Sequence, residues 1–153
     1  MENTNFESLA IVLKEKGEAS SLTRGCSMRP MLREHKDVVT MAKISRKLKK
    51  GDVVVYPSKN GEFVLHRIVA IKKGEYIIRG DNNYFTEYGI IDNDIVGILK
   101  CFYRDGKYVD CETNKKYKLY TFYICHSYFL RYPWKKIVRP LLGKIKRFVL
   151  GKK

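Results

Sequence analysis

Short apolar runs separated by turn signals constrain the fold of this chain more than any other feature. The central part of the sequence contains dipeptides in which glycine is next to Asp or Asn, namely Gly51-Asp52, Asn60-Gly61 and Asp105-Gly106. Tight turns of this kind join antiparallel strands. We therefore predict a mainly β fold built from short antiparallel strands. The expected strands are Asp37–Ala42, Val53–Tyr56, Phe63–Ile71, Glu75–Arg79, Ile95–Tyr103 and Lys107–Cys111.

The two ends of the chain differ from this β-rich centre. Apolar residues recur at helical spacing near the N-terminus, at Phe6, Leu9, Ala10 and Leu13. They predict a short amphipathic helix that ends near Gly17, within an N-terminal segment of residues 1–20. A C-terminal tail, residues 115–153, begins with an aromatic-rich stretch, and its end has the spacing of a basic amphipathic helix over Lys135–Val149. At 153 residues the chain fits one domain, with residues 21–114 as its core.

The positive charge is concentrated in that tail. The chain has 31 Lys and Arg against 16 Asp and Glu, a net charge of +15, yet no acidic residue follows Glu112 and twelve basic ones do. We expect the tail to bind an anionic membrane surface. An acidic peptide or partner, or packing of the apolar stripe on the core, are the alternatives. Nucleic acid is not the expected partner, because no recognised binding motif accompanies the charge.

The sequence also indicates a location and a redox state. The N-terminus lacks the basic start and apolar run of a secretory signal, and no window of about eighteen apolar residues could span a membrane. We therefore expect a cytoplasmic protein, peripheral on the membrane surface. The four cysteines form no CxxC pair, so we expect free thiols without a disulfide or metal site. Cys26, next to Ser27, is expected to be a small buried filler, with a nucleophile as the alternative.

One octamer, GCSMRPML (Gly25–Leu32), reads as a fixed irregular loop that presents Ser27. Gly25 permits backbone conformations that other residues resist. Pro30 disfavours helical geometry at the preceding residue and removes a backbone donor. An ordinary turn between two elements would have the same composition, so the octamer alone does not assign a function.

Further along the chain are the partners that a nucleophilic serine requires. Serine attacks only when a base takes its proton, and His66, in the run VLHRIVAI, titrates near neutral pH. A carboxylate would then orient the imidazole, and both Asp81, in the turn RGDNN, and Glu87 qualify. Taken singly, each has a simpler explanation: a packed histidine, a turn-forming aspartate and a solvated glutamate.

The order and wording of these segments resemble the type I signal peptidase family. The resemblance runs from about Leu22 to Lys100 through GCSMRPML, GDVVVY, VLHRIVAI, IIRGDNN and IVGIL. Most bacterial members have a lysine base followed by arginine. The endoplasmic-reticulum, archaeal and sporulation-type members have histidine, as in His66-Arg67 here. The family shares its fold with self-cleaving phage-repressor-like proteins.

This resemblance implies a serine endopeptidase that cleaves a leader or signal segment from a peptide or preprotein without a cofactor. Ser27 would be the nucleophile, His66 the general base, and Glu87 or Asp81 the orienting carboxylate. The backbone N–H of Ser27 would belong to the oxyanion hole. The other residues expected at the oxyanion and substrate-binding site are Gly25, Met28 and Pro30. Gly25 stands where many bacterial members carry a hydroxyl, so a second donor would come from elsewhere.

Two departures from the family keep a second function open. The chain lacks the usual membrane-spanning anchor and the large accessory β-domain of many bacterial members. The alternative is a catalytically silent module on the same fold that binds extended peptides by strand addition. A self-cleaving regulator is not expected, because 26 residues before Ser27 are too few for a usual helix-turn-helix domain.

Overall fold

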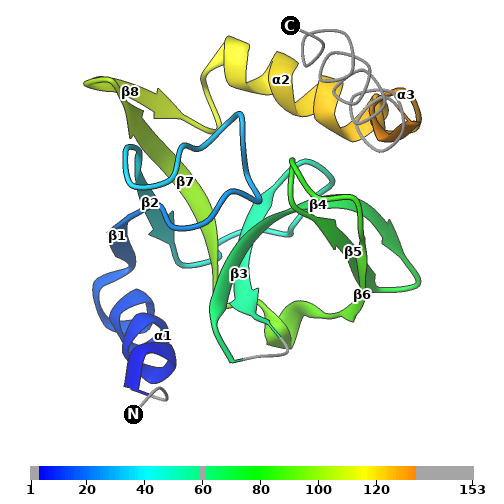
Figure 1. Cartoon of the computed structure of the whole chain (residues 1–153). Coiled ribbons are helices and arrows are strands. Elements are labelled where there is room, and N and C mark those ends of the chain that lie inside the picture. Colours follow the sequence, from blue (N-terminus) through cyan, green and yellow to red (C-terminus); the bar gives the residue numbers. More distant parts are fainter. Residues whose placement is uncertain (1–3, 59–60, 134–153) are drawn as a thin grey trace, which may run out of the picture.

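A computed structural model describes residues 4–58 and 61–133, and its main element is one antiparallel sheet (Figure 1). The mainly β prediction is confirmed. The strands are β1 (Glu18–Leu22), β2 (Val38–Ala42), β3 (Val53–Pro57), β4 (Phe63–Lys72), β5 (Glu75–Arg79), β6 (Glu87–Ile90), β7 (Gly97–Arg104) and β8 (Lys107–Asp110). Their order in the sheet is β1-β2-β7-β3-β4-β5-β6, with β8 paired to β7.

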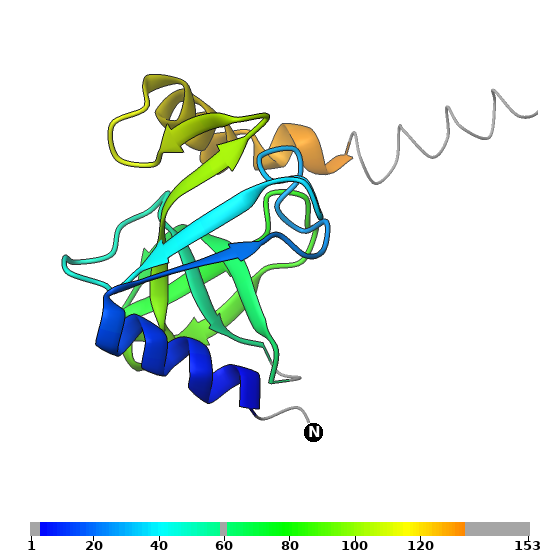
Figure 2. The ribbon, with the colours of Figure 1, turned by 90° about the vertical axis from the view of Figure 1, so that its left-hand side faces the viewer.

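The sheet curls, and the helices lie at its opposite ends. Helix α1 (Thr4–Lys16) lies at the lower end in both views, whereas α2 (Lys115–His126) and α3 (Tyr128–Pro133) lie at the upper end (Figures 1 and 2). A short 3-10 helix, η1 (Asp92–Asp94), joins β6 to β7. Within the described residues, no helix is both long and apolar enough to cross a membrane.

The sheet contributes to the core from both faces, because successive side chains of a strand point in opposite directions. In β3, Val53 and Val55 pack on one face, and Val54 and Tyr56 pack on the other. The first face is covered by the loop after β1 and by α2. The core residues there are Met28, Met31, Leu32, Val39, Val53, Leu99, Phe102 and Tyr117. On the second face they are Leu48, Val54, Tyr56, Ile68, Tyr76, Ile78 and Ile95.

The N-terminal helix ends next to Gly17, as predicted from the sequence, although residues 18–20 of the assigned N-terminal segment are not helical. It ends at Lys16, and residues 18–22 form β1, an edge strand that pairs with β2. Leu13 of the predicted apolar face is 1% exposed and sits where Gly97 leaves room for it, since a Cβ at Gly97 would lie 2.8 Å from the Leu13 side chain. This contact fixes α1 against the sheet.

The start of the C-terminal tail is helical. Asn114 caps α2 by accepting a hydrogen bond from the Tyr117 N–H, and this cap explains why the helix begins at Lys115. The basic amphipathic helix predicted over Lys135–Val149 lies outside the described residues, as does Asn60 of the predicted turn before β4.

Candidate active site

The imidazole of His66 lies in a buried network with a carboxylate and a phenol. His66 Nδ1 is 3.0 Å from Glu87 Oε1 and 2.9 Å from the Tyr56 hydroxyl, and the same hydroxyl donates to Glu87 Oε1 at 2.7 Å. The His66 residue is 5% exposed. Three different strands, β3, β4 and β6, supply the three side chains.

The strand register explains why these side chains meet. Residues directly opposite each other in an antiparallel pair lie on the same face, and alternate residues of one strand share that face. Val54 is opposite His66, so Tyr56 is a diagonal neighbour of His66 on the same face. Ile68, two residues after His66, is opposite Ile78, and Ile78 is opposite Glu87 on the other side. The register therefore carries all three side chains to one face.

The hydrogen bonds determine which nitrogen of His66 carries the proton. Tyr56 gives its hydroxyl proton to Glu87, so the Tyr56 oxygen is left to accept from Nδ1. Glu87 as a carboxylate can only accept. Nδ1 therefore bears the hydrogen, and Nε2 keeps its lone pair. This is the tautomer that a general base requires.

Burial shifts the pKa values of His66 and Tyr56 so that the neutral form of each side chain is favoured. It lowers the pKa of His66 below 6.5, although the nearby Glu87 charge opposes the shift. Burial and the hydrogen bond to Glu87 raise the pKa of Tyr56 far above 10. At neutral pH the imidazole is therefore uncharged and the phenol remains a donor.

The neighbouring residue, Arg67, belongs to a different network on the opposite face. Its guanidinium makes two hydrogen bonds of 2.8 Å to the two carboxylate oxygens of Asp81, and both side chains are fully buried. Tyr120 of α2 also donates to Asp81, at 3.0 Å. Arg67 further contacts the hydroxyls of Tyr117 and Thr121. Its pKa is raised by Asp81, so it stays charged despite the desolvation.

The sequence did not decide whether Glu87 or Asp81 lies beside His66. Strand alternation places these two carboxylates on opposite faces of the sheet. His66 points to the face that carries Glu87, and Arg67 points to the face that carries Asp81. Of these two carboxylates, the structure brings Glu87 into hydrogen-bonding contact with His66. Asp81 instead ties the turn after β5 to β4 and α2.

The turn that contains Asp81 also holds the loop of Ser27. The Asn82 N–H donates to the Ser27 carbonyl oxygen at 2.7 Å, and the Asn82 side chain donates to the Cys26 carbonyl at 3.2 Å. Gly80 leaves no room for a side chain beside this loop, because an added Cβ would lie 2.8 Å from the Ser27 carbonyl oxygen. The loop therefore docks on backbone atoms of the Gly80–Asn83 turn.

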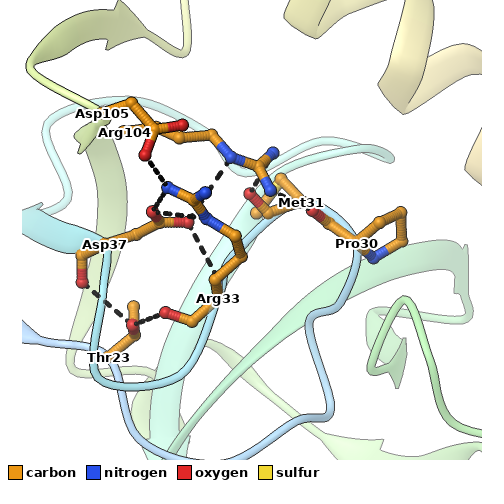
Figure 3. Close-up of polar contacts among 7 residues, drawn as sticks. All are labelled: Thr23, Pro30, Met31, Arg33, Asp37, Arg104 and Asp105. Carbon is orange, nitrogen blue, oxygen red and sulfur yellow. Dashed lines mark hydrogen bonds and ion pairs between the residues drawn. The ribbon is translucent and has the colours of Figure 1, made fainter.

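A charged cluster secures the other side of the same loop (Figure 3). Asp37, fully buried, accepts from the side chain of Arg33 at 2.7 and 3.0 Å and from its backbone N–H at 2.8 Å. Arg104 of β7 lies beside Asp37 and donates to the carbonyls of Pro30 and Met31, at 3.0 and 3.4 Å. These contacts fix a segment that has no regular secondary structure of its own.

The remaining predicted residues of this loop have mixed surroundings. Gly25 has a φ of +76°, and its N–H is already bonded to the Glu34 carboxylate at 2.9 Å. Met28 is 5% exposed and packs in the core. Pro30 follows a cis peptide bond. Cys26, expected to be buried, is exposed, so the prediction for this residue was wrong.

Ser27 and His66 are not directly bonded in this structure. Within the described residues, the Ser27 hydroxyl makes no hydrogen bond to the imidazole, and the two segments are linked through the Gly80–Asn83 turn. The core residues of the Ser27 loop pack on the sheet face that carries Arg67, whereas His66 points to the face that carries Glu87. Chemically, the arrangement offers a hydroxyl on a fixed loop and an oriented, neutral imidazole.

Several residues of the site were not identified from the sequence. Tyr56 ends an apolar run in the sequence. Its contact with His66 can be inferred only from the register of β3 and β4, which makes the two residues diagonal neighbours. Tyr120 and Thr121 lie in the aromatic-rich stretch of the tail, where helical spacing places them on the face that meets Arg67. Among the residues that the structure describes, no cluster of three or more His, Cys, Asp and Glu side chains could hold a metal ion.

Comparison with known proteins does not assign this site. No protein-family model matches the chain, and neither does any sequence among the curated proteins.

Proposed function

We propose that this protein is a serine endopeptidase that cleaves a leader or signal segment from a peptide substrate. The observation that carries the proposal is the contact of His66 Nδ1 with Glu87, which leaves Nε2 free to accept a proton. Ser27, on a loop held by the Gly80–Asn83 turn, is the nucleophile. The resemblance of the same segments to signal peptidases supports the assignment.

In the proposed reaction, Ser27 Oγ attacks the carbonyl carbon of the scissile bond while His66 Nε2 takes its proton. His66 then gives this proton to the leaving amine, and an acyl ester on Ser27 remains. Water, deprotonated by the same nitrogen, hydrolyses the ester. Glu87 orients the imidazole and stabilises its charged form, and the Ser27 N–H is the expected oxyanion donor.

The resemblance also suggests the substrate class. Signal peptidases prefer small residues on the acyl side of the cleaved bond, and we propose the same preference here.

The test is cleavage of a diverse peptide pool by the full chain, with detergent or anionic vesicles present and products read by mass spectrometry. Wild type, Ser27→Ala and His66→Ala are compared, with Ser21→Ala as a matched control because Ser21 lies on the exposed edge strand β1. We expect cleavage by wild type and Ser21→Ala, and none by the other two variants. Cleavage that survives in Ser27→Ala would contradict the proposal.

A silent peptide-binding module is the second candidate, and the same samples distinguish it. If peptides are retained intact by wild type and by Ser27→Ala alike, the protein binds without cleaving. The observation that favours this alternative is that the Ser27 hydroxyl makes no hydrogen bond to His66, whose side chain points to the sheet face opposite the one on which the Ser27 loop packs.

A further inference from the structure

The outer side of α2 and α3 presents large apolar side chains to solvent. The α2–α3 apolar surface consists of Leu119, Phe122, Phe129 and Leu130, which are 71%, 61%, 85% and 79% exposed. Leu119 and Phe122 are three residues apart and lie on one face of α2, and Phe129 and Leu130 continue in α3. Exposed apolar groups that gather in this way mark an interaction surface rather than ordinary scatter.

This surface is not the face by which α2 packs on the sheet. Tyr117 and Ile124 are buried, and Tyr117 and Thr121 reach Arg67. Folding therefore uses one side of the helix, and the residues of the α2–α3 apolar surface lie on the other. An amphipathic helix needs one apolar stripe to fold, so a second stripe calls for another partner.

The charges around the surface identify the chemistry of that partner. Lys115, one turn before Leu119, and Lys118, one turn before Phe122, are exposed beside the apolar side chains. No acidic residue follows Glu112, and residues 134–153 add eight basic ones. A second copy of this surface would bring lysine against lysine, and the basic tail of the chain would repel it in the same way. The partner must combine negative charge with an apolar interior.

We propose that the α2–α3 apolar surface binds the surface of an anionic lipid bilayer. The lysines meet the headgroups while the phenylalanine and leucine side chains enter the boundary between headgroups and acyl chains. This inference does not depend on peptidase activity, and it assigns membrane contact to described residues rather than to the tail alone.

The same helices contact the turn that holds Ser27. The Tyr128 hydroxyl donates to the Tyr84 carbonyl at 2.9 Å, and Arg131 donates to the Asp81 carbonyl at 3.2 Å. Binding to a bilayer therefore brings the candidate site close to the lipid surface. If the proposed function also holds, substrates emerging at the membrane would be the ones cleaved.

The test is sedimentation of the full chain with vesicles, which requires no substrate. Phosphatidylglycerol–phosphatidylcholine vesicles are compared with pure phosphatidylcholine, at low and high salt. One variant replaces Phe122, Phe129 and Leu130 by serine. Its matched control makes the same change to serine at three exposed isoleucines outside this surface. These are Ile11, Ile71 and Ile91, which are 49%, 42% and 44% exposed.

We expect wild type and the isoleucine control to bind anionic vesicles, and the phenylalanine–leucine variant to bind about tenfold or more weakly, with the difference retained at high salt. A second variant, Lys115→Gln with Lys118→Gln, should weaken binding mainly at low salt. Equal binding by wild type and the phenylalanine–leucine variant would overturn the proposal, as would equal affinity for duplex DNA. If wild type is a dimer and the phenylalanine–leucine variant is a monomer, the surface binds a second copy of the chain instead.

Discussion

His66 and Glu87 are joined by a 3.0 Å contact between Nδ1 and Oε1, although they come from strands that are not neighbours in the sheet. Strand β5 lies between them, and its Ile78 is opposite both Ile68 and Glu87. The contact spans two strand pairs and fixes the ring in the tautomer with Nε2 unprotonated. The proposed role of His66 as a general base depends on this contact.

The pH dependence of cleavage should reflect the buried position of His66. Burial lowers the pKa of His66 below 6.5, and the base acts only when it is unprotonated. We therefore expect kcat/KM to rise with pH through an acid limb whose midpoint lies below 6.5, and to be at its plateau at neutral pH. Initial rates on one cleaved peptide measure this profile.

Glu87→Gln should change both the height and the position of that profile. The Glu87 charge raises the pKa of His66 against the effect of burial, so its removal moves the acid limb to still lower pH. Loss of the carboxylate also removes the stabilisation of the imidazolium, and kcat should fall by about 10²–10⁴-fold. An unchanged limb would mean that Glu87 does not interact with the titrating base.

Tyr56→Phe tests whether the phenol positions the network. The variant removes the donor to Glu87 and an acceptor for Nδ1, so we expect kcat to fall by about tenfold, with KM unchanged and a shifted acid limb. Tyr76→Phe is the matched control, because Tyr76 is also buried and bonded to a carboxylate, that of Asp92. The control should lose stability without a shift in the pH profile, and equal kinetic effects of the two variants would contradict a positioning role.

Asp81→Asn should act mainly on stability. It leaves the Arg67 guanidinium buried with an incomplete ion pair, and breaking such a pair costs about 3–5 kcal/mol. Asp105→Asn is the control, since Asp105 pairs with Arg33 at an exposed position, where solvent screens the salt bridge and its loss should have little effect on stability. Urea unfolding measures both. Similar losses for the two variants would show that the buried pair has no special role.

Gly80→Ala tests the docking of the Ser27 loop. The added Cβ would lie 2.8 Å from the Ser27 carbonyl oxygen, so the loop must move, and we expect kcat to fall by about tenfold or more. Gly97→Ala creates a similar clash, but with Leu13 at α1. It should lower stability and leave kcat nearly unchanged, which thermal melts combined with rates will show. A reduced kcat in Gly97→Ala alone would contradict this account.

Much of the fold could be predicted from local sequence patterns, and the missing parts have physical reasons. Apolar runs and glycine turns located six of the eight strands found within residues 4–58 and 61–133. Strand β1 was missed because EASSL is an edge strand with mostly exposed side chains, and β6 because its four residues include Gly89 and bury little. Neither strand has the alternation that predicts a half-buried strand.

The candidate site was only partly predictable, because its contacts depend on register. The sequence identified Ser27, His66 and the two carboxylates, but it could not decide which carboxylate faces the imidazole. That choice follows from the opposite directions of His66 and Arg67, once β4 is placed between β3 and β5. Tyr56 needed the same register to be recognised.

The proposed mechanism requires Ser27 and His66 to act as one unit, and a comparison of single and double variants measures this coupling. Initial rates on one cleaved peptide are measured for wild type, Ser27→Ala, His66→Ala and the double variant. We predict that each single change lowers kcat by about 10⁴-fold or more and that the double variant is no slower than either. Losses that multiply in the double variant, or cleavage that persists without Ser27, would contradict the account.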